Sequence, residues 1–84
     1  MKNKELLKRK IIYRSSHRGS KEMDLLLGSF VKKYISKFND SELKDLEYLI
    51  SIDDESISNW YFEKERKNKV LESKVSLMLK KFKI

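Results

Sequence analysis

The apolar residues of this chain recur at steps of three and four, and no proline interrupts that spacing. The 84 residues include no proline and only two glycines, Gly19 and Gly28. Steps of three and four place side chains on one face of an α-helix, whereas a strand needs alternation in steps of two. Proline would break such helices in their interior. The spacing therefore predicts an all-α chain.

Two long helices are expected in the first half of the chain. The first covers residues 4–16, and its apolar side is formed by Leu7, Ile11 and Ile12. Gly19 then breaks the helix, because glycine is the residue best able to adopt a left-handed or tight-turn conformation. The second helix covers residues 20–38 and carries the widest apolar stripe, which predicts that it forms the centre of the core. That stripe consists of Met23, Leu26, Leu27, Phe30, Val31, Tyr34, Ile35 and Phe38.

Three shorter helices are expected in the second half. Asn39 begins the third, because its side chain can accept from first-turn amides while Glu42 reaches back. The acidic run at residues 53–55 begins the fourth, since the positive end of the helix dipole favours it. Residues 63–69 form a charged connection to the fifth helix. The inward residues of these helices are Leu43, Leu46, Leu49, Ile50, Ile57, Trp60, Tyr61, Leu71, Val75, Met78 and Phe82.

The five helices are expected to pack as one compact bundle, a single domain over residues 1–84, because chains of this length rarely hold two cores. Disulfides and thiolate metal sites are excluded, since the chain has no cysteine. With one histidine, a structural zinc site is not expected either. No apolar run approaches the roughly 20 residues of a membrane span, and no signal-peptide core follows the basic first residues. These features fit a mature cytosolic protein or one whose targeting segment has been removed; we expect the first, a cytoplasmic protein without membrane insertion.

The net charge of +7 is unevenly distributed along the chain. Residues 1–21 carry +7, residues 22–62 carry −5, and residues 63–84 carry +5. A nucleic-acid binder more often shows one continuous basic face. The basic composition is therefore weak evidence for nucleic-acid binding, and we expect no nucleic-acid partner.

No catalytic constellation stands out, so an enzyme is not expected. A nucleophile system needs a base that a third group positions, and the single histidine, His17, lies beside a turn. Asp53 and Asp54 form an acidic pair, but such a pair at a helix start is more often a cap than an acid–base dyad.

The aromatic residues 60–62 have two interpretations. With Lys64, Arg66 and Lys67 they could form a stacking surface for single-stranded nucleic acid. We favour the interpretation in which Trp60 and Tyr61 anchor a short helix to the core and the basic residues stay solvated.

Residues 17–22, His-Arg-Gly-Ser-Lys-Glu, also allow two interpretations. In the first, Gly19 makes an interhelix turn, Glu22 interacts with a helix N-terminus, and Arg18 is solvated. In the second, Gly19 lets another backbone approach closely, while Arg18 and Glu22 flank it with opposite charges. Arg18 can pair bidentately with a carboxylate, which suits protein docking. Residue chemistry alone leaves the two interpretations even.

The Arg-Gly-x-x-Glu pattern at residues 18–22 matches the signature of the succinate dehydrogenase flavinylation factor family, which this chain resembles. The match continues through the apolar helix at 23–30 and resumes at residues 49–50, at Asp53-Asp54 and at Asn59-Trp60. It spans roughly residues 6–80. One departure is the segment 63–67, which lacks the glycine or proline that some members carry.

The resemblance implies a five-helix bundle that binds the flavoprotein subunit of succinate dehydrogenase and promotes covalent attachment of FAD; whether fumarate reductase is also a client stays open. Members of the family act in the bacterial cytoplasm and related ones in mitochondria, and of the two we expect the bacterial cytoplasm. We expect an assembly factor that binds no cofactor stably, and a monomer, because no helix shows a second apolar face. The residues that match the family's motif blocks are Arg18, Gly19, Glu22, Asp53, Asp54 and Trp60; His17 and Tyr13 lie beside the first block.

These assignments predict that Arg18→Ala or Glu22→Ala leaves the bundle folded and abolishes flavinylation of the partner. The alternative function is a small basic helical module that binds nucleic acid, and its binding would weaken steeply with salt.

Overall fold

Polar residues mark where four of the helices begin, because each accepts a hydrogen bond from a first-turn amide that has no partner inside the helix. At two of the four, the residue three positions further on bonds back to the cap and completes a capping box. The four caps are Ser20, Asn39, Asp53 and Ser73.

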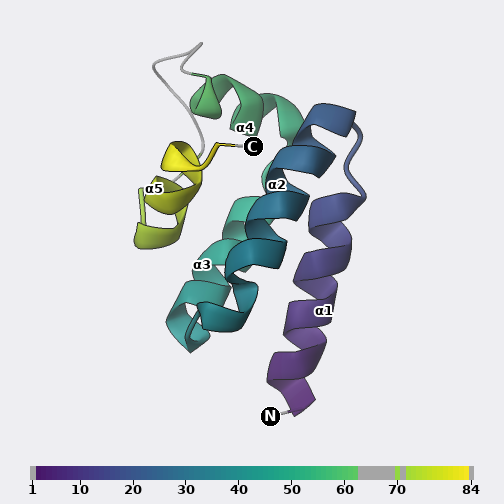
Figure 1. Cartoon of the computed structure of the whole chain (residues 1–84), viewed down its shortest axis with the longest axis vertical. Coiled ribbons are helices and arrows are strands. Elements are labelled where there is room, and N and C mark those ends of the chain that lie inside the picture. Colours follow the sequence, from purple (N-terminus) through teal and green to yellow (C-terminus); the bar gives the residue numbers. More distant parts are fainter. Residues whose placement is uncertain (1, 63–69, 71, 84) are drawn as a thin grey trace.

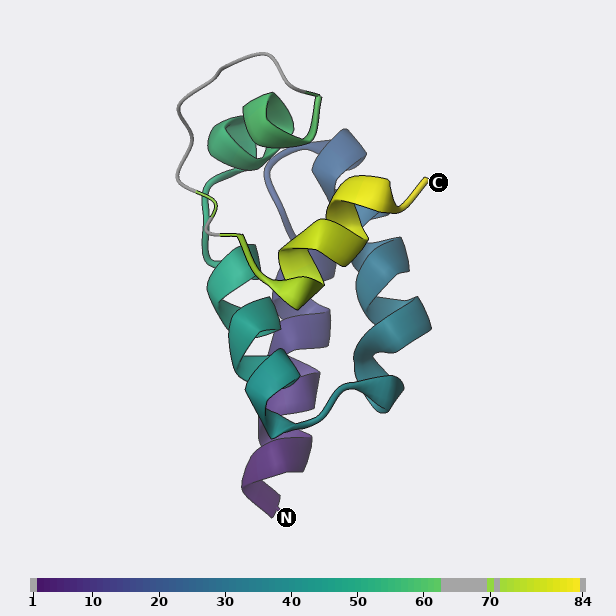
Figure 2. The same cartoon turned by 90° about the vertical axis from the view of Figure 1, so that its left-hand side faces the viewer.

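The structure is a computed structural model that describes residues 2–62, 70 and 72–83. Its helices are α1 (Lys2–Ser16), α2 (Lys21–Tyr34), the 3-10 turn η1 (Ile35–Lys37), α3 (Asp40–Ile50), α4 (Asp54–Tyr61) and α5 (Lys74–Lys81). α1 packs against both α2 and α3, and α4 lies near the end of the bundle at which α1 connects to α2 (Figures 1 and 2). The described residues contain five α-helices and no strand, which confirms the predicted all-α class.

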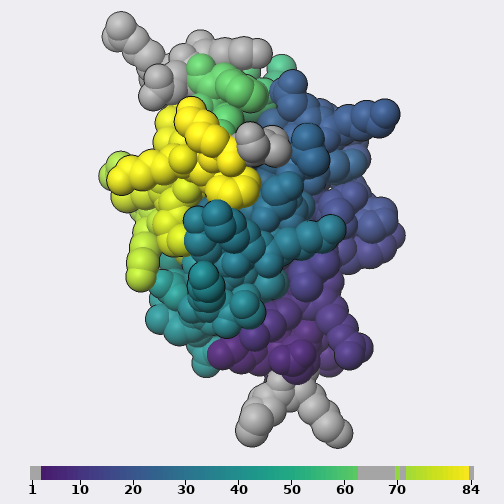
Figure 3. Space-filling view, in the orientation of Figure 1, coloured from purple at the N-terminus to yellow at the C-terminus, as the bar shows by residue number. Residues whose placement is uncertain are grey.

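Phe30 lies at the centre of the core with none of its surface exposed. Its ring lies 5.1 Å from the Tyr34 ring and 5.4 Å from the Phe82 ring, measured between centroids. Side chains near the C-terminus therefore lie directly against those of α2 (Figure 3). Every helix contributes to this apolar burial, the main stabilising term in folding. The other buried apolar residues are Ile11, Met23, Leu26, Leu27, Val31, Ile35, Phe38, Leu43, Leu46, Leu49, Ile50, Ile52, Ile57, Val70, Val75 and Leu79.

Small residues bring α1 and α2 close together. Ser15 is buried and its hydroxyl donates to the Ile12 carbonyl at 2.9 Å. Gly28 lies opposite, where an added Cβ atom would be 3.8 Å from the Ser15 carbonyl oxygen. The separation of two packed helices depends on the side chains at their contact. This contact holds the end of α1, and with it the turn at residues 17–20, against α2.

Two side chains tie the end of α4 to the end of α5. The Tyr61 hydroxyl donates to the Phe82 carbonyl, and the Lys80 ammonium donates to the Trp60 carbonyl. The Lys80 ammonium also lies 4.8 Å from the centroid of the Trp60 ring, within the range of a cation–π contact. Trp60 and Tyr61 are half-buried and pack on the core, as the anchoring interpretation predicted. Lys64, Arg66 and Lys67 lie outside the described residues.

Several details of the predicted helices are wrong. The helix expected over 20–38 ends at Tyr34, and η1 follows it. Apolar spacing did not distinguish an α-helix from the tighter 3-10 turn, because Ile35 in η1 and Phe38 directly after it both stay buried. Ile12 was expected on the apolar side of the first helix but is 37% exposed, since it lies at the edge of the buried face. Leu71 and the connection 63–69 lie outside the described residues. Among the helices described, none is both long and apolar enough to cross a membrane.

Candidate functional site

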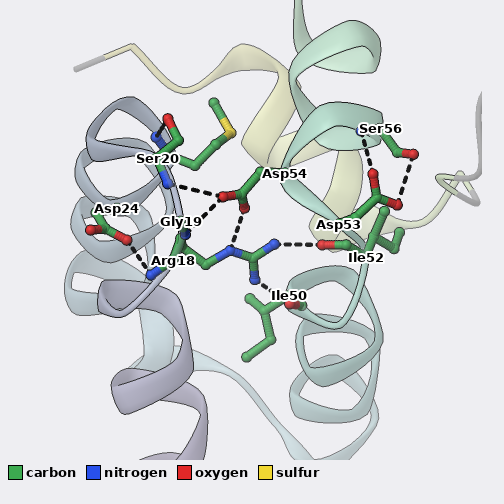
Figure 4. Close-up of polar contacts among 10 residues, drawn as sticks. Arg18, Gly19, Ser20, Asp24, Ile50, Ile52, Asp53, Asp54 and Ser56 are labelled. Atoms are coloured by element: carbon green, nitrogen blue, oxygen red, sulfur yellow. Dashed lines mark hydrogen bonds and ion pairs between the residues drawn. The ribbon is translucent and has the colours of Figure 1, made fainter.

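The Arg18 side chain reaches from the α1–α2 turn to the α3–α4 turn (Figure 4). Its Nε atom donates to Asp54 Oδ1 at 2.6 Å. The two other guanidinium nitrogens donate to the carbonyls of Ile50, the last residue of α3, and of Ile52, in the α3–α4 turn. The Arg18 side chain is only 10% exposed and that of Asp54 23% exposed. A planar guanidinium offers donors in a fixed fork, which suits a site with three acceptors at once.

The second carboxylate oxygen of Asp54 accepts hydrogen bonds from the backbone of the same α1–α2 turn. Oδ2 accepts from the Gly19 amide at 3.1 Å and from the Ser20 amide at 3.2 Å. The Arg18 amide donates to the Asp24 carboxylate on α2. Two carboxylates thus satisfy three successive backbone amides, at the point where the N-terminal dipole of α2 favours negative charge. We name Arg18, Asp54 and the bonds between them the Arg18–Asp54 bridge.

Asp53, the neighbour of Asp54, has a different task. Its carboxylate accepts from the Ser56 amide at 3.0 Å and from the Ser56 hydroxyl at 2.9 Å, which caps α4. The preference for a cap over an acid–base dyad is confirmed at Asp53. Within the acidic pair, Asp53 therefore caps α4, whereas Asp54 holds the α1–α2 turn.

Tyr13 and His17 form an exposed pair at the end of α1. Their rings stack with centroids 3.9 Å apart, and His17 Nδ1 lies 2.8 Å from the Tyr13 carbonyl oxygen. Both rings lie on the rim of an open depression of about 470 Å³ between the α1–α2 and α3–α4 turns. The residues that line it are Tyr13, Arg14, His17, Arg18, Gly19, Ile50, Ser51, Ile52, Asp53 and Asp54.

Gly19 lies in the connection between α1 and α2, where a break was expected. Of the two conformations that the sequence allowed, it does not adopt the left-handed one. A Cβ atom added to it would meet only Asp54 Oδ2, at an ordinary contact distance of 3.7 Å. Hydrogen bonds from backbone amides to the Asp54 carboxylate hold the turn instead, so the fold itself does not require glycine at this exposed position.

Arg18 is not the solvated side chain of the first interpretation. Its charge is paired with Asp54, and each of its three side-chain nitrogens donates a hydrogen bond within the chain. Removal of Arg18 would leave a carboxylate and two carbonyls without these partners. The geometry therefore predicts a less stable bundle for Arg18→Ala, and its expected loss of flavinylation stays a prediction.

The remaining two candidates lie outside the depression. Glu22 is exposed in the first turn of α2, and among the described residues nothing bonds to its carboxylate. Trp60 is half-buried at the far end of α4, beneath Lys80. The structure thus brings together six of the eight predicted residues around one depression, and sets Glu22 and Trp60 apart from it.

Sequence reasoning missed three partners of the turn. Asp24 had a weak signal, as an acidic residue in the first turn of a helix. The carbonyls of Ile50 and Ile52 had none, because any residue carries the same backbone oxygen. Among the described residues, no group of three or more acidic or histidine side chains is placed to hold a metal ion.

Comparison with known proteins shows one family. Residues 9–83 match the family model described as the flavinator of succinate dehydrogenase. A protein of Dictyostelium discoideum named succinate dehydrogenase assembly factor 2, mitochondrial, is 43% identical over 60 residues, which cover 71% of this chain and 43% of that protein. A protein of Acetobacter pasteurianus named FAD assembly factor SdhE is 33% identical over 55 residues, which cover 66% of this chain and 50% of that protein. The matches thus span half or less of these relatives. No solved structure matches the chain.

The expected location in the bacterial cytoplasm is contradicted by these relatives. The protein from Dictyostelium discoideum and its similar counterparts from Schizosaccharomyces japonicus and Scheffersomyces stipitis are all named as mitochondrial. The reasoning failed because the residues of a folded helical bundle carry no signal for the compartment in which it works.

Proposed function

The chain belongs to the succinate dehydrogenase flavinator family, and from that premise we propose that it binds the flavoprotein subunit of succinate dehydrogenase and promotes covalent attachment of FAD to that subunit. The names of its relatives, assembly factors for succinate dehydrogenase and for FAD, support this proposal. We also propose that residues 1–84 form one domain, that the chain acts as a monomer, and that the flavoprotein of fumarate reductase is a second client.

The observation that carries the proposal is the Arg18–Asp54 bridge. It joins the two sequence blocks on which the family resemblance rests, although they are 36 residues apart. The bridge holds the α1–α2 turn against the α3–α4 turn, so that Gly19 and Asp53 lie on the same depression as the stacked ring of His17. A surface fixed in this way loses little conformational entropy on binding, which favours affinity.

Gly19 supports a docking role because the fold does not need it. The residue is exposed, its backbone is not left-handed, and an added Cβ atom would fit. A glycine in such a place is useful to a partner, whose backbone can approach where a side chain would stand. We therefore assign the closest approach of the flavoprotein to Gly19.

The proposed residues divide into two groups by their contacts in the free chain. Arg18 and Asp54 position the surface, because their polar atoms are already occupied. The proposed contacts with the flavoprotein are Tyr13, His17, Gly19, Glu22, Asp53 and Trp60.

The mechanism we propose needs no catalytic group on this chain. When bound to the flavoprotein, FAD would supply the chemistry of its own attachment to a histidine of that subunit, and the factor would hold the flavoprotein so that the two groups are aligned. Alignment of reacting groups is worth about 7–11 kcal/mol at its limit. The single imidazole of the chain, His17, is already stacked on Tyr13 and bonded to its carbonyl. We therefore give it a contact role.

Glu22→Ala tests the proposal most directly. The carboxylate is exposed and unbonded among the described residues, so its removal should leave the fold intact. The purified apo-flavoprotein is incubated with FAD and the factor, and covalent FAD is read as fluorescence of the denatured flavoprotein band. We expect Glu22→Ala and Gly19→Ala to lose most of this signal, while far-UV circular dichroism shows that both variants stay folded.

Glu55→Ala is the matched control. Glu55 holds in α4 the position that Glu22 holds in α2, the second residue of the helix, and both residues are exposed. Both changes remove the same favourable interaction with a helix dipole. Normal covalent FAD with Glu22→Ala, or equal loss with Glu55→Ala, would contradict the proposed docking role.

A further inference from the structure

Two large apolar side chains stand out into solvent from α1. Leu6 is 61% exposed and Tyr13 is 63% exposed, the two highest values among the large apolar residues described. They are seven residues apart, which places them on the same side of the helix, two turns from each other. Isolated exposed apolar residues are ordinary, but two on one helix face form a surface that a partner can cover.

Arg9 and Lys10 lie between these two side chains and are also exposed. At 3.6 residues per turn, Leu6, Arg9, Lys10 and Tyr13 fall within an arc of about 100°. Ile11, on the opposite side of the helix, is fully buried. α1 forms one edge of the molecule (Figure 1), and the four residues of this arc are exposed. We name these four residues the outer face of α1.

Among the residues that the structure describes, no ion pair is formed by the cations of the outer face. Residues 2–16 carry six Lys or Arg and one Glu, a charge of +5. Among the described residues, the ion pair made by α1 joins Lys4 to Asp40 at 3.2 Å, and Arg9 and Lys10 make none. The charge of this face is therefore available to a partner.

The outer face continues into the proposed docking site. Tyr13 belongs to both, and the His17 ring that stacks on it lines the depression beside Gly19. A partner seated on Gly19 would meet Tyr13 first and then the cations further along α1.

We propose that the outer face of α1 docks onto an acidic patch with an apolar centre on the flavoprotein subunit, an inference that rests on the proposed function. Carboxylates of the partner pair with Arg9 and Lys10, while its apolar side chains cover Leu6 and Tyr13. A nucleic acid fits less well, because a phosphate backbone offers nothing to bury against Leu6. Complementary charge mainly accelerates association, whereas the covered apolar residues slow dissociation.

The test is a charge reversal, Arg9→Glu with Lys10→Glu, measured by the kinetics of binding to the immobilised apo-flavoprotein subunit. The control is Lys81→Glu with Lys83→Glu, two exposed residues at the end of α5 and just beyond it. Each pair changes the net charge by four, from +7 to +3. Electrostatic steering changes association rates by about 10-fold to 1,000-fold. We expect the outer-face variant to associate at least about 10-fold more slowly at low salt, the control to change much less, and the difference to shrink at about 1 M salt, where screening is strong.

The apolar part of the face has its own readout. Leu6→Ala with Tyr13→Ala should raise the dissociation rate constant and leave the association rate constant nearly unchanged.

If the unmodified chain binds the flavoprotein and the charge-reversed chain associates equally fast at low salt, the docking face is wrong and the proposed function stands. If the unmodified chain does not bind, both are wrong. If the charge-reversed chain still binds the flavoprotein but loses binding to a labelled DNA duplex that the unmodified chain binds, the partner of the outer face is a nucleic acid and the assignment of the flavoprotein is overturned.

Discussion

Replacing Arg18 with alanine removes the side chain that ties the α1–α2 turn to the α3–α4 turn. The substitution deletes the ion pair to Asp54 and two bonds to main-chain carbonyls. Breaking a buried ion pair on one side costs about 3–5 kcal/mol, since the remaining charge stays without its partner. The lower figure applies here, because Asp54 is 23% exposed and keeps its bonds from the Gly19 and Ser20 amides.

We therefore expect Arg18→Ala to lower the free energy of unfolding by about 3 kcal/mol. Domains of this size are stable by only about 5–15 kcal/mol, and each kcal/mol shifts Tm by about 4–8 °C. The variant should thus melt at least about 12 °C below the unmodified chain. Urea unfolding followed by far-UV circular dichroism measures the free energy directly.

Two further measurements isolate the bridge. Arg14→Ala removes an exposed arginine one turn earlier and should stay within about 0.5 kcal/mol of the unmodified chain. A double-mutant cycle of Arg18→Ala with Asp54→Ala should give a coupling energy of about 1–3 kcal/mol. A loss below about 1 kcal/mol for Arg18→Ala, or a coupling energy near zero, would refute the bridge as a stabilising element.

Two other predictions concern stability alone. Gly28→Ala should raise the free energy of unfolding by about 0.5–1 kcal/mol, because Gly28 is inside α2 and its added Cβ atom would meet Ser15 and Ser16 only at ordinary contact distances; a destabilised variant in the same urea assay would show that the α1–α2 contact is tighter. The Asn39 amide and, next, the Lys74 ammonium lower the pKa of Glu42 from its ordinary value of 4.5. Since the folded state favours the charged carboxylate, the stability that Glu42 contributes is present above pH 4.5 and is lost as the pH falls through its lower folded pKa. Unfolding measured at neutral and acidic pH should therefore show a smaller acid-induced loss of stability for Glu42→Gln than for the unmodified chain.

The parts of the fold that follow local rules were predictable from sequence. Asn39 and Asp53 were identified as helix starts because capping depends on residues within one turn. The end of α2 was missed, since Ile35 and Phe38 keep the apolar spacing across η1. Ser73 also caps its helix through a local signal, the capping box with Ser76, which the apolar spacing of α5 alone did not reveal.

Six of the eight candidate residues lie around one depression, but their contacts were not predictable from sequence. Arg18 and Asp54 were both singled out, yet no sequence rule pairs residues 36 positions apart. This tertiary contact also explains why Arg18 is not solvated. Gly19 lies in the expected break between helices without the left-handed conformation, and its contact with a partner stays a proposal.

The 36-residue separation within the Arg18–Asp54 bridge also bears on the order of folding. Closing a loop of that length costs about 3 kcal/mol of chain entropy, as much as the bridge is expected to contribute. The bridge therefore cannot nucleate folding; it closes when the packing of α1, α2 and α3 has already brought the two turns together. A partly folded copy lacks the shaped turn at Gly19. The same contact that shapes the proposed docking surface thus ensures that only a completed chain presents that surface.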